Sequence, residues 1–233
     1  LSETLEIPVS TSILTTPMSP QSFAQTHPSV YHSFIGRKND KSALIRSAWT
    51  TATGRILTTS AGGIGISRED EIVLVNSLAE KLNDADERVR IAAIRAVGNF
   101  NLRDVITKLG ISGDVSKSGS VLCSLADRAR DKRHPVRVEG MTVISKIWGV
   151  AAGEILAGNE AVISMLGAIP TKVFETFYAN ALDVNILLDH VMFEQLIPLN
   201  YPPTKSKGSK QANGDSQATQ VNGDGPFDAD KLR

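Results

Sequence analysis

The chain has 233 residues, of which 41% are hydrophobic, and its 25 basic and 25 acidic residues give a net charge of zero. This composition allows a packed core, and the neutral charge excludes a general attraction to nucleic acid or to anionic membranes. The single Cys123 excludes a disulfide framework and a multi-cysteine metal site, and its apolar neighbours predict a small buried side chain. The sequence has no run of 18 apolar residues and no signal-peptide pattern, so it gives no indication of membrane insertion.

The N-terminal part of the chain divides into two regions. Residues 1–36 are expected to be an irregular or disordered lead-in, because Ser, Thr and Pro are frequent there and no helical period is sustained. From Asp40 apolar residues recur at helical spacing, which predicts one long helix that ends at the glycines near position 63. Trp49 lies on the inner stripe of that helix and is expected in the core. Arg46, one turn earlier, is a candidate for a partner contact, as is Lys41.

Two further helices are predicted between residues 69 and 109. Ser67 is placed to cap the first of them, with acidic residues in its first turn. The second follows the turn at residues 83–86, and alanines on its inner face would allow close antiparallel packing. A glycine-rich stretch, residues 110–119, is expected to be a flexible linker.

The C-terminal part repeats this organisation. Helices are predicted within residues 119–157, with Pro135 in a first turn, where its missing N–H costs little. A looser pair is expected within 160–198, with Asp183 capping its second helix. Residues 201–233 are read as a disordered polar loop or tail, because they offer too little apolar surface to offset the entropy of ordering.

An internal repeat defines the predicted fold. Residues 78–100 and 125–147 are similar over their whole length, and they share Leu, Ala, Asp, Val and Arg at matching positions 47 residues apart. A self-similar helix–turn–helix unit of this length is typical of HEAT-type solenoids. We therefore predict an all-α solenoid of antiparallel helix pairs over residues 37–200. The pairs are expected at about 40–66, 69–109, 119–157 and 160–198.

The sequence offers little for catalysis or for metal binding. The glycines at 62–65 do not follow a strand, so they are read as a helix connector and not as a phosphate-binding loop. The four histidines have no ligand-like spacing, and the carboxylates lie mainly at helix starts and turns. We expect no enzymatic activity and no required cofactor.

The strongest charged feature is a basic cluster in the second copy of the repeat. Its five cations surround one carboxylate, Asp131, for a local charge of +4; they are Arg128, Arg130, Lys132, Arg133 and Arg137. One interpretation is structural: Arg137, like Arg90 in the first copy, would bond the turn aspartate (Asp131 here, Asp84 there) or the carbonyls of a neighbouring repeat.

The other cations of the cluster leave two interpretations open. They form either a solvated face or an anion site beside a helix N-terminus, for a polyphosphate, an acidic partner segment or DNA backbone. DNA alone would need a longer basic stripe. Arg130 and Arg133 occur only in the second copy, so they are the better candidates for function.

Four segments in one order and spacing resemble the central HEAT array of the PDS (precocious dissociation of sisters) cohesion proteins. They are residues 39–57, 78–98, 125–141 and 169–198. The most specific parts are RVR after an aspartate-rich turn, RARDKR followed by VR, and the stretch from IPTK to FEQLIP. The sequence departs from the family at Gly140, where Ala is usual, and at Trp148-Gly149, which replaces a more polar segment. Leu1 is not Met and both ends read as interior sequence, so we expect a piece of a longer protein.

The resemblance implies a nuclear, chromatin-associated regulator of cohesin without enzymatic activity. Proteins of this family bind the kleisin subunit of cohesin and act with the Wapl-type releasing factor and the cohesin acetyltransferase. Some also hold inositol hexakisphosphate in a basic pocket, and the matching residues here are those of the basic cluster. The alternative is another HEAT solenoid adaptor, either nucleic-acid-binding or karyopherin-like.

Overall fold

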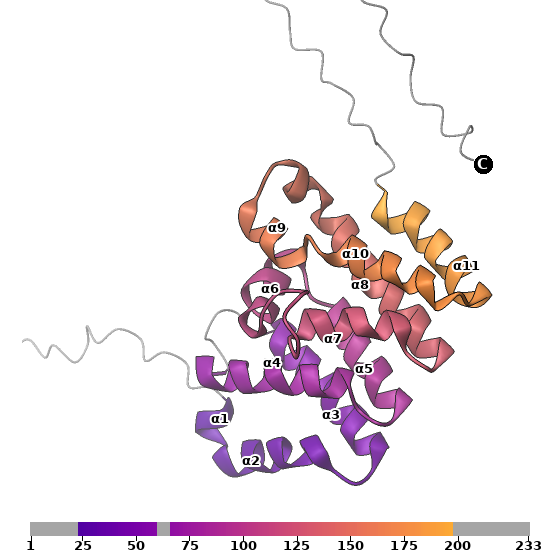
Figure 1. Ribbon diagram of the computed structural model, residues 1–233. Coiled ribbons are helices and arrows are strands. Elements are labelled where there is room, and N and C mark those ends of the chain that lie inside the picture. Colours follow the sequence, from indigo (N-terminus) through magenta and orange to yellow (C-terminus); the bar gives the residue numbers. More distant parts are fainter. Residues whose placement is uncertain (1–22, 60–65, 198–233) are drawn as a thin grey trace, which may run out of the picture.

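The computed structural model describes residues 23–59 and 66–197 (Figure 1). Every regular element in these ranges is a helix, which confirms the predicted all-α class for the described residues. The α-helices are α1 Phe23–Thr26, α2 Pro28–Gly36, α3 Ala43–Thr59, α4 Arg68–Leu82, α5 Glu87–Gly98, α6 Leu102–Thr107, α7 Val121–Asp127, α8 His134–Leu156, α9 Glu160–Leu166, α10 Ile169–Phe174 and α11 Leu182–Val191. Shorter 3₁₀ segments are η2 Arg37–Asn39, η3 Leu109–Ser112, η4 Arg128–Arg130 and η5 Glu175–Ala179, and η6 Met192–Leu196 is a π-helical turn.

The helices form two stacked layers, as a solenoid requires. In one layer α3 packs on α5, α5 on α8 and α8 on α11, while in the other α4 packs on α7 and α7 on α10. Within a repeat the layers are joined by the contacts of α4 with α5 and of α7 with α8. Figure 1 shows the stack rising from α2 and α3 to α10 and α11. One continuous apolar core runs between the layers, which is the arrangement predicted from the internal repeat.

Side-chain caps begin several of these helices. The hydroxyl oxygen of Ser67 accepts a hydrogen bond from the Asp70 N–H at 3.1 Å, as predicted, and Ser120 does the same for Cys123 at 3.0 Å. Pro135 lies in the first turn of α8, also as predicted. Each cap satisfies an N–H that the helix itself leaves unpaired, so the sequence fixes where these helices start.

The closest contact between helices lies within one layer. A Cβ atom at Gly54 of α3 would stand 2.5 Å from the Cβ of Ala96 of α5, so only glycine fits there. We predicted that the alanines of α5 pack against its partner α4. Ala96 instead packs against Gly54 of α3, in the preceding repeat.

The expected irregular lead-in over residues 1–36 is wrong for residues 23–36, which form α1 and α2. The Pro28 ring favours a helix start, and the Phe34 ring stacks on the buried Trp49 with centroids 5.5 Å apart. The helix pair predicted at about 40–66 is wrong in its bounds, because the described residues there form one long helix, α3, and the helix that packs on it through Phe34 is α2, before residue 40. The predictions for residues 1–22 and for the polar tail at 201–233 lie outside the described residues.

The stretch expected to be a flexible linker, residues 110–119, is an ordered series of turns. Asp114 accepts hydrogen bonds from the N–H groups of Ser116 and Lys117 at 2.6 and 3.0 Å, and the side chain of Val115 is fully buried. The Val115 N–H donates to the Met165 carbonyl at 3.2 Å. Glycine here serves tight turns, two of them at positive φ (Gly113 and Gly119), and does not indicate mobility.

The last repeat differs from the prediction at its second helix. The N-cap of α11 is Ala181, and Asp183 lies inside the first turn, where its carboxylate faces the preceding repeat. Trp148 and Gly149, which depart from the family pattern, pack against η6, the segment that follows α11. The indole N–H of Trp148 donates to the Leu196 carbonyl at 3.2 Å, and a Cβ at Gly149 would stand 2.7 Å from the Gln195 carbonyl oxygen.

Candidate interaction site

Three arginines hold the turns between the paired helices in the same way. Each lies six residues after an aspartate, and its Nη1 donates to the carbonyls of that aspartate and of the next residue. The N–H two residues after each aspartate donates back to its Oδ1 at 2.9 Å. The pairs are Asp40 with Arg46, Asp84 with Arg90, and Asp131 with Arg137. Each turn is thus held by the helix that follows it.

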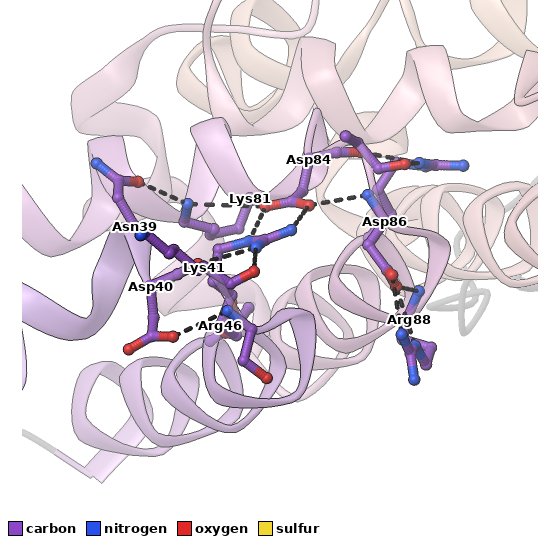
Figure 2. A network of polar contacts seen from close by, with 12 residues as sticks. Asn39, Asp40, Lys41, Arg46, Lys81, Asp84, Asp86 and Arg88 are labelled. Atoms are coloured by element: carbon purple, nitrogen blue, oxygen red, sulfur yellow. Dashed lines mark hydrogen bonds and ion pairs between the residues drawn. The ribbon is translucent and has the colours of Figure 1, made fainter.

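The same arginines also link successive repeats. Arg46 donates from Nε and Nη2 to the two carboxylate oxygens of Asp84, both at 2.8 Å (Figure 2). Arg90 donates from Nη2 to Asp131 Oδ1 at 2.9 Å, and its Nε forms an ion pair with Oδ2 at 2.8 Å, at an angle too poor for a hydrogen bond. Arg137 donates to the carboxylate of Asp183. We call these links the Arg–Asp ladder.

For Arg90 and Arg137 we predicted a bond to the aspartate of their own turn or to carbonyls of a neighbouring repeat. The structure shows the opposite combination. The carbonyls belong to the arginine's own turn, and the carboxylate belongs to the next repeat. Arg46, predicted as a partner contact, is a further member of the ladder. The roles of Asp40 and Asp183 were missed. A search for aspartate and arginine six residues apart would have found the first three turns.

The desolvation cost of burying the ladder carboxylates is offset by the hydrogen bonds that they accept. Desolvation is the largest influence on the pKa of Asp131 and raises it, but the hydrogen bonds from the Arg133 N–H and from Arg90 outweigh it, so the pKa lies below its ordinary value. The pKa of Asp84 is lowered in the same way, with Arg46 opposing desolvation. Beside Asp84, burial lowers the pKa of Lys81, whose ammonium donates to Asn39 Oδ1 at 3.1 Å (Figure 2).

Most of the predicted basic cluster is paired within the molecule. Arg128 binds Asp131 at 2.9 Å and Asn83 at 3.0 Å, so its charge is paired with a ladder aspartate. Arg130 binds Glu175 at 2.5 Å and Arg133 lies 3.3 Å from Glu87, and both of these pairs are exposed. Lys132 is exposed and its ammonium meets no carboxylate in the described part of the chain. Lys41 is likewise exposed, and only its carbonyl takes part, by accepting from Arg46.

A second surface feature, absent from the sequence analysis, is an apolar groove of about 750 Å³ in the last repeat. It lies between α10 with η5 on one side and α11 with η6 on the other; its lining includes Pro170, Phe174, Phe177, Tyr178, Leu188 and Met192. Tyr178 is 85% exposed and Phe177 57%. The three aromatics within residues 174–178 were the available signal, because such a density is unusual in a chain with 5% aromatic residues.

The described residues contain no group of His, Cys, Asp or Glu side chains arranged to hold a metal ion. None of the helices in residues 23–59 and 66–197 is long and apolar enough to cross a membrane. The surface features that remain are the turns with their charged residues and the groove beside them. Both are suited to contacts with another macromolecule.

The stacked helix pairs define an α-solenoid of the HEAT type. The family model "Sister chromatid cohesion protein PDS5 protein" matches residues 9–218, so the chain belongs to that family. This confirms the resemblance predicted from the four sequence segments. Membership of a cohesion-protein family also supports the prediction that the chain has no enzymatic role.

Two curated relatives and one solved structure agree with this assignment. The chain is 27% identical over 171 residues to the sister chromatid cohesion protein pds5 of Schizosaccharomyces pombe, and 25% identical over 185 residues to PDS5 of Saccharomyces cerevisiae. The alignments cover 73% and 78% of this chain but only 13% of each relative. A solved structure of the Pds5–Scc1 complex matches with a TM-score of 0.62 and 25% identity, over 76% of this chain and 25% of that one.

Proposed function

We propose that this chain is part of a non-enzymatic regulator of cohesin that binds the kleisin subunit through its last repeat. The observation that carries the proposal is the likeness to the Pds5 chain of a Pds5–Scc1 complex, in which a protein of this family is bound to a kleisin. The apolar groove gives the physical basis, because exposed aromatic side chains in a pocket are the usual centres of binding energy in protein interfaces.

The groove suits an apolar segment of a partner. Its walls are two antiparallel helical segments, and a short helix or extended strand can place alternate side chains between them. Glu175 and Asp189 line the groove among the apolar residues, so polar or basic partner residues are expected where the segment leaves it.

The basic cluster would contribute at the edge of this interface. Lys132 is available without cost, and the exposed pairs of Arg130 with Glu175 and of Arg133 with Glu87 are easily broken, because such pairs contribute at most about 1 kcal/mol. Inositol hexakisphosphate at this cluster is a secondary proposal. It would have to displace both glutamates, which makes it the weaker occupant.

The same proposal places the protein in the nucleus, at chromatin through cohesin, in concert with a Wapl-type releasing factor and the cohesin acetyltransferase. These roles follow from the family and would involve parts of the relatives beyond the matched 13%. The surface described above is therefore tested through the kleisin alone.

A titration with the purified N-terminal region of a kleisin tests the proposal. Phe177→Ser with Tyr178→Ser should weaken binding about tenfold or more, the loss typical of interface hot spots. Leu44→Ser, at a similarly exposed leucine of α3 outside the groove, is the matched control and should leave affinity unchanged. Equal affinity of all three proteins would reject the groove as the site.

A second arm concerns the basic cluster. Lys132→Glu with Arg133→Glu should weaken kleisin binding less than the groove variant does, because these residues lie at the rim. DNA binding with a steep salt dependence, together with no kleisin binding, would favour the alternative of a nucleic-acid-binding solenoid.

A further inference from the structure

The Arg–Asp ladder is incomplete in the last repeat. Its aspartates lie two residues before the N-cap of each second helix: Asp84 precedes Asp86, and Asp131 precedes Arg133. The N-cap of α11 is Ala181, so the matching position is Ala179. The arginine position, six residues further on, is Asn185. The turn before α11 therefore has neither the aspartate nor the arginine of the earlier turns, and the carboxylate that Arg137 contacts comes instead from Asp183, inside the first turn of α11.

The consequence falls on Arg137, the last arginine of the series. Arg46 and Arg90 both direct Nε and Nη2 at one buried carboxylate of the next repeat. Arg137 instead donates from Nη2 to Asp183, whose side chain is 50% exposed. The Nε–H of Arg137 is buried, and within the described residues it has no hydrogen-bond acceptor. A buried donor without an acceptor is unfavourable, so this Nε–H would gain from a further oxygen atom.

A pocket of about 250 Å³ lies beside this guanidinium. Arg130, Lys132 and, from the first turn of α8, Arg137 line it on one side, and the last repeat lines it with the small side chains of Ala179 and Ala181. Two alanines thus leave room where a ladder aspartate would reach across. Asp131 also lines the pocket, but its charge is held by Arg90 and Arg128.

We propose that this pocket binds a carboxylate side chain of a partner protein, an aspartate or glutamate that takes the place of the missing ladder residue. The Nε–H of Arg137 and the ammonium of Lys132 are its donors. Asp183 and Glu175 stay on Nη2 of Arg137 and on Arg130, so the incoming carboxylate meets Lys132, which has no carboxylate partner among residues 23–59 and 66–197. The segment η5 supplies Thr176 and Ala179 to this pocket and Phe177 and Tyr178 to the groove, so one peptide can occupy both.

The pocket is independent of the identity of the partner in the proposed function, so it is tested with a generic probe. The probes are a blocked Gly-Asp-Gly peptide and its Gly-Asn-Gly counterpart, added to the full chain while the arginine Nε–H signals are recorded by NMR. The Arg137→Lys variant assigns the Arg137 signal by its loss. We expect a saturable shift of that signal with the aspartate peptide only, and unchanged signals from Arg46 and Arg90, whose carboxylate partners are already in place. No shift, a shift with the asparagine peptide, or a shift that potassium chloride reproduces would overturn the proposal.

A second variant separates the pocket from the general charge of the surface. Ala179→Asp places a carboxylate at the vacant ladder position, so it should raise Tm and reduce the peptide affinity at least tenfold. Ser164→Asp adds the same charge at an exposed position of α9 outside the pocket, and should leave the peptide response intact. An undiminished response in Ala179→Asp would also overturn the proposal.

Discussion

The junction between the repeats of α4–α5 and α7–α8 and the junction that follows it are built from the same kinds of element but end differently. At the first, Arg90 and Asp131 are buried and form an ion pair. At the second, Arg137 meets an exposed Asp183, and aromatic side chains of η5 remain in solvent. The repeat signature, an aspartate and an arginine six residues apart, therefore marks where this protein is held together. The exposed apolar surface lies beyond the last such pair.

The largest test of this comparison removes the ladder arginine at each junction. Arg90→Ala should lower the free energy of unfolding by about 3–5 kcal/mol, because it removes one of the two cations, Arg90 and Arg128, that are paired with the buried Asp131 carboxylate. Arg137→Ala should cost about half as much, since Asp183 can be solvated. Urea denaturation with an unchanged m-value measures both, and equal losses would contradict the difference between the junctions.

Two glycines of α8 extend the comparison along a single helix. A Cβ at Gly140 would stand 2.7 Å from the Cβ of Arg128 and 3.0 Å from its carbonyl carbon, so Gly140→Ala should destabilise by about 1–3 kcal/mol through overpacking. Gly153, near the C-terminal end of α8, has free space around it. Gly153→Ala should therefore raise the free energy of unfolding by about 0.5–1 kcal/mol. Thermal unfolding of both variants shows whether each is more or less stable than the parent. A more stable Gly140→Ala would mean that η4 can move to make room for the methyl group.

Acidification should weaken the ladder. The folded-state pKa values of Asp84 and Asp131 lie below their ordinary values, so these groups stabilise the fold fully above the unfolded pKa of about 3.9. That contribution is lost as the pH falls through the lower folded values. Stability measured by urea from pH 5 to pH 2 should therefore decline.

The matched variant for acidification is Asp183→Asn. The pKa of Asp183 is also lowered, with desolvation opposed by Arg137, but the group is half exposed. The variant should keep nearly all of the acid dependence. If the stability of Asp183→Asn did not change with pH, the acid-sensitive link would be Arg137–Asp183, which would contradict the assignment to Asp84 and Asp131.

The smallest effect is expected in the groove. Tyr178→Ser should change the free energy of unfolding by less than about 0.5 kcal/mol, as exposed substitutions do. Thermal denaturation checks it. A loss above 1 kcal/mol would mean that Tyr178 is packed in solution, and the groove would then be closed to a partner.

Local patterns were sufficient to predict the all-α stack. Matching Leu, Val and Arg positions revealed the repeat, and the Ser67 cap and Pro135 marked helix starts that the structure confirms. The helix α2 was missed because its nine residues follow a stretch without helical period, and its stability comes from the contact of Phe34 with Trp49 across the fold.

The candidate site was less predictable for a physical reason. Spacing along the chain identified Arg90 and Arg137 as turn residues, but which repeat supplies their carboxylate is decided by stacking. The same holds for the groove, whose walls come from residues 170–178 and 185–192, and for Val115, whose N–H donates to the Met165 carbonyl of α9. The cations of residues 128–133 looked alike in the sequence, and only their neighbours in space separated Lys132 from the paired arginines.

The ladder also gives the stack a direction. Every link runs from a guanidinium in one repeat to a carboxylate in the next along the chain. Successive repeats of this kind therefore stack in one orientation. In the reverse orientation like charges would meet, so the order of repeats is written into the chemistry of their turns.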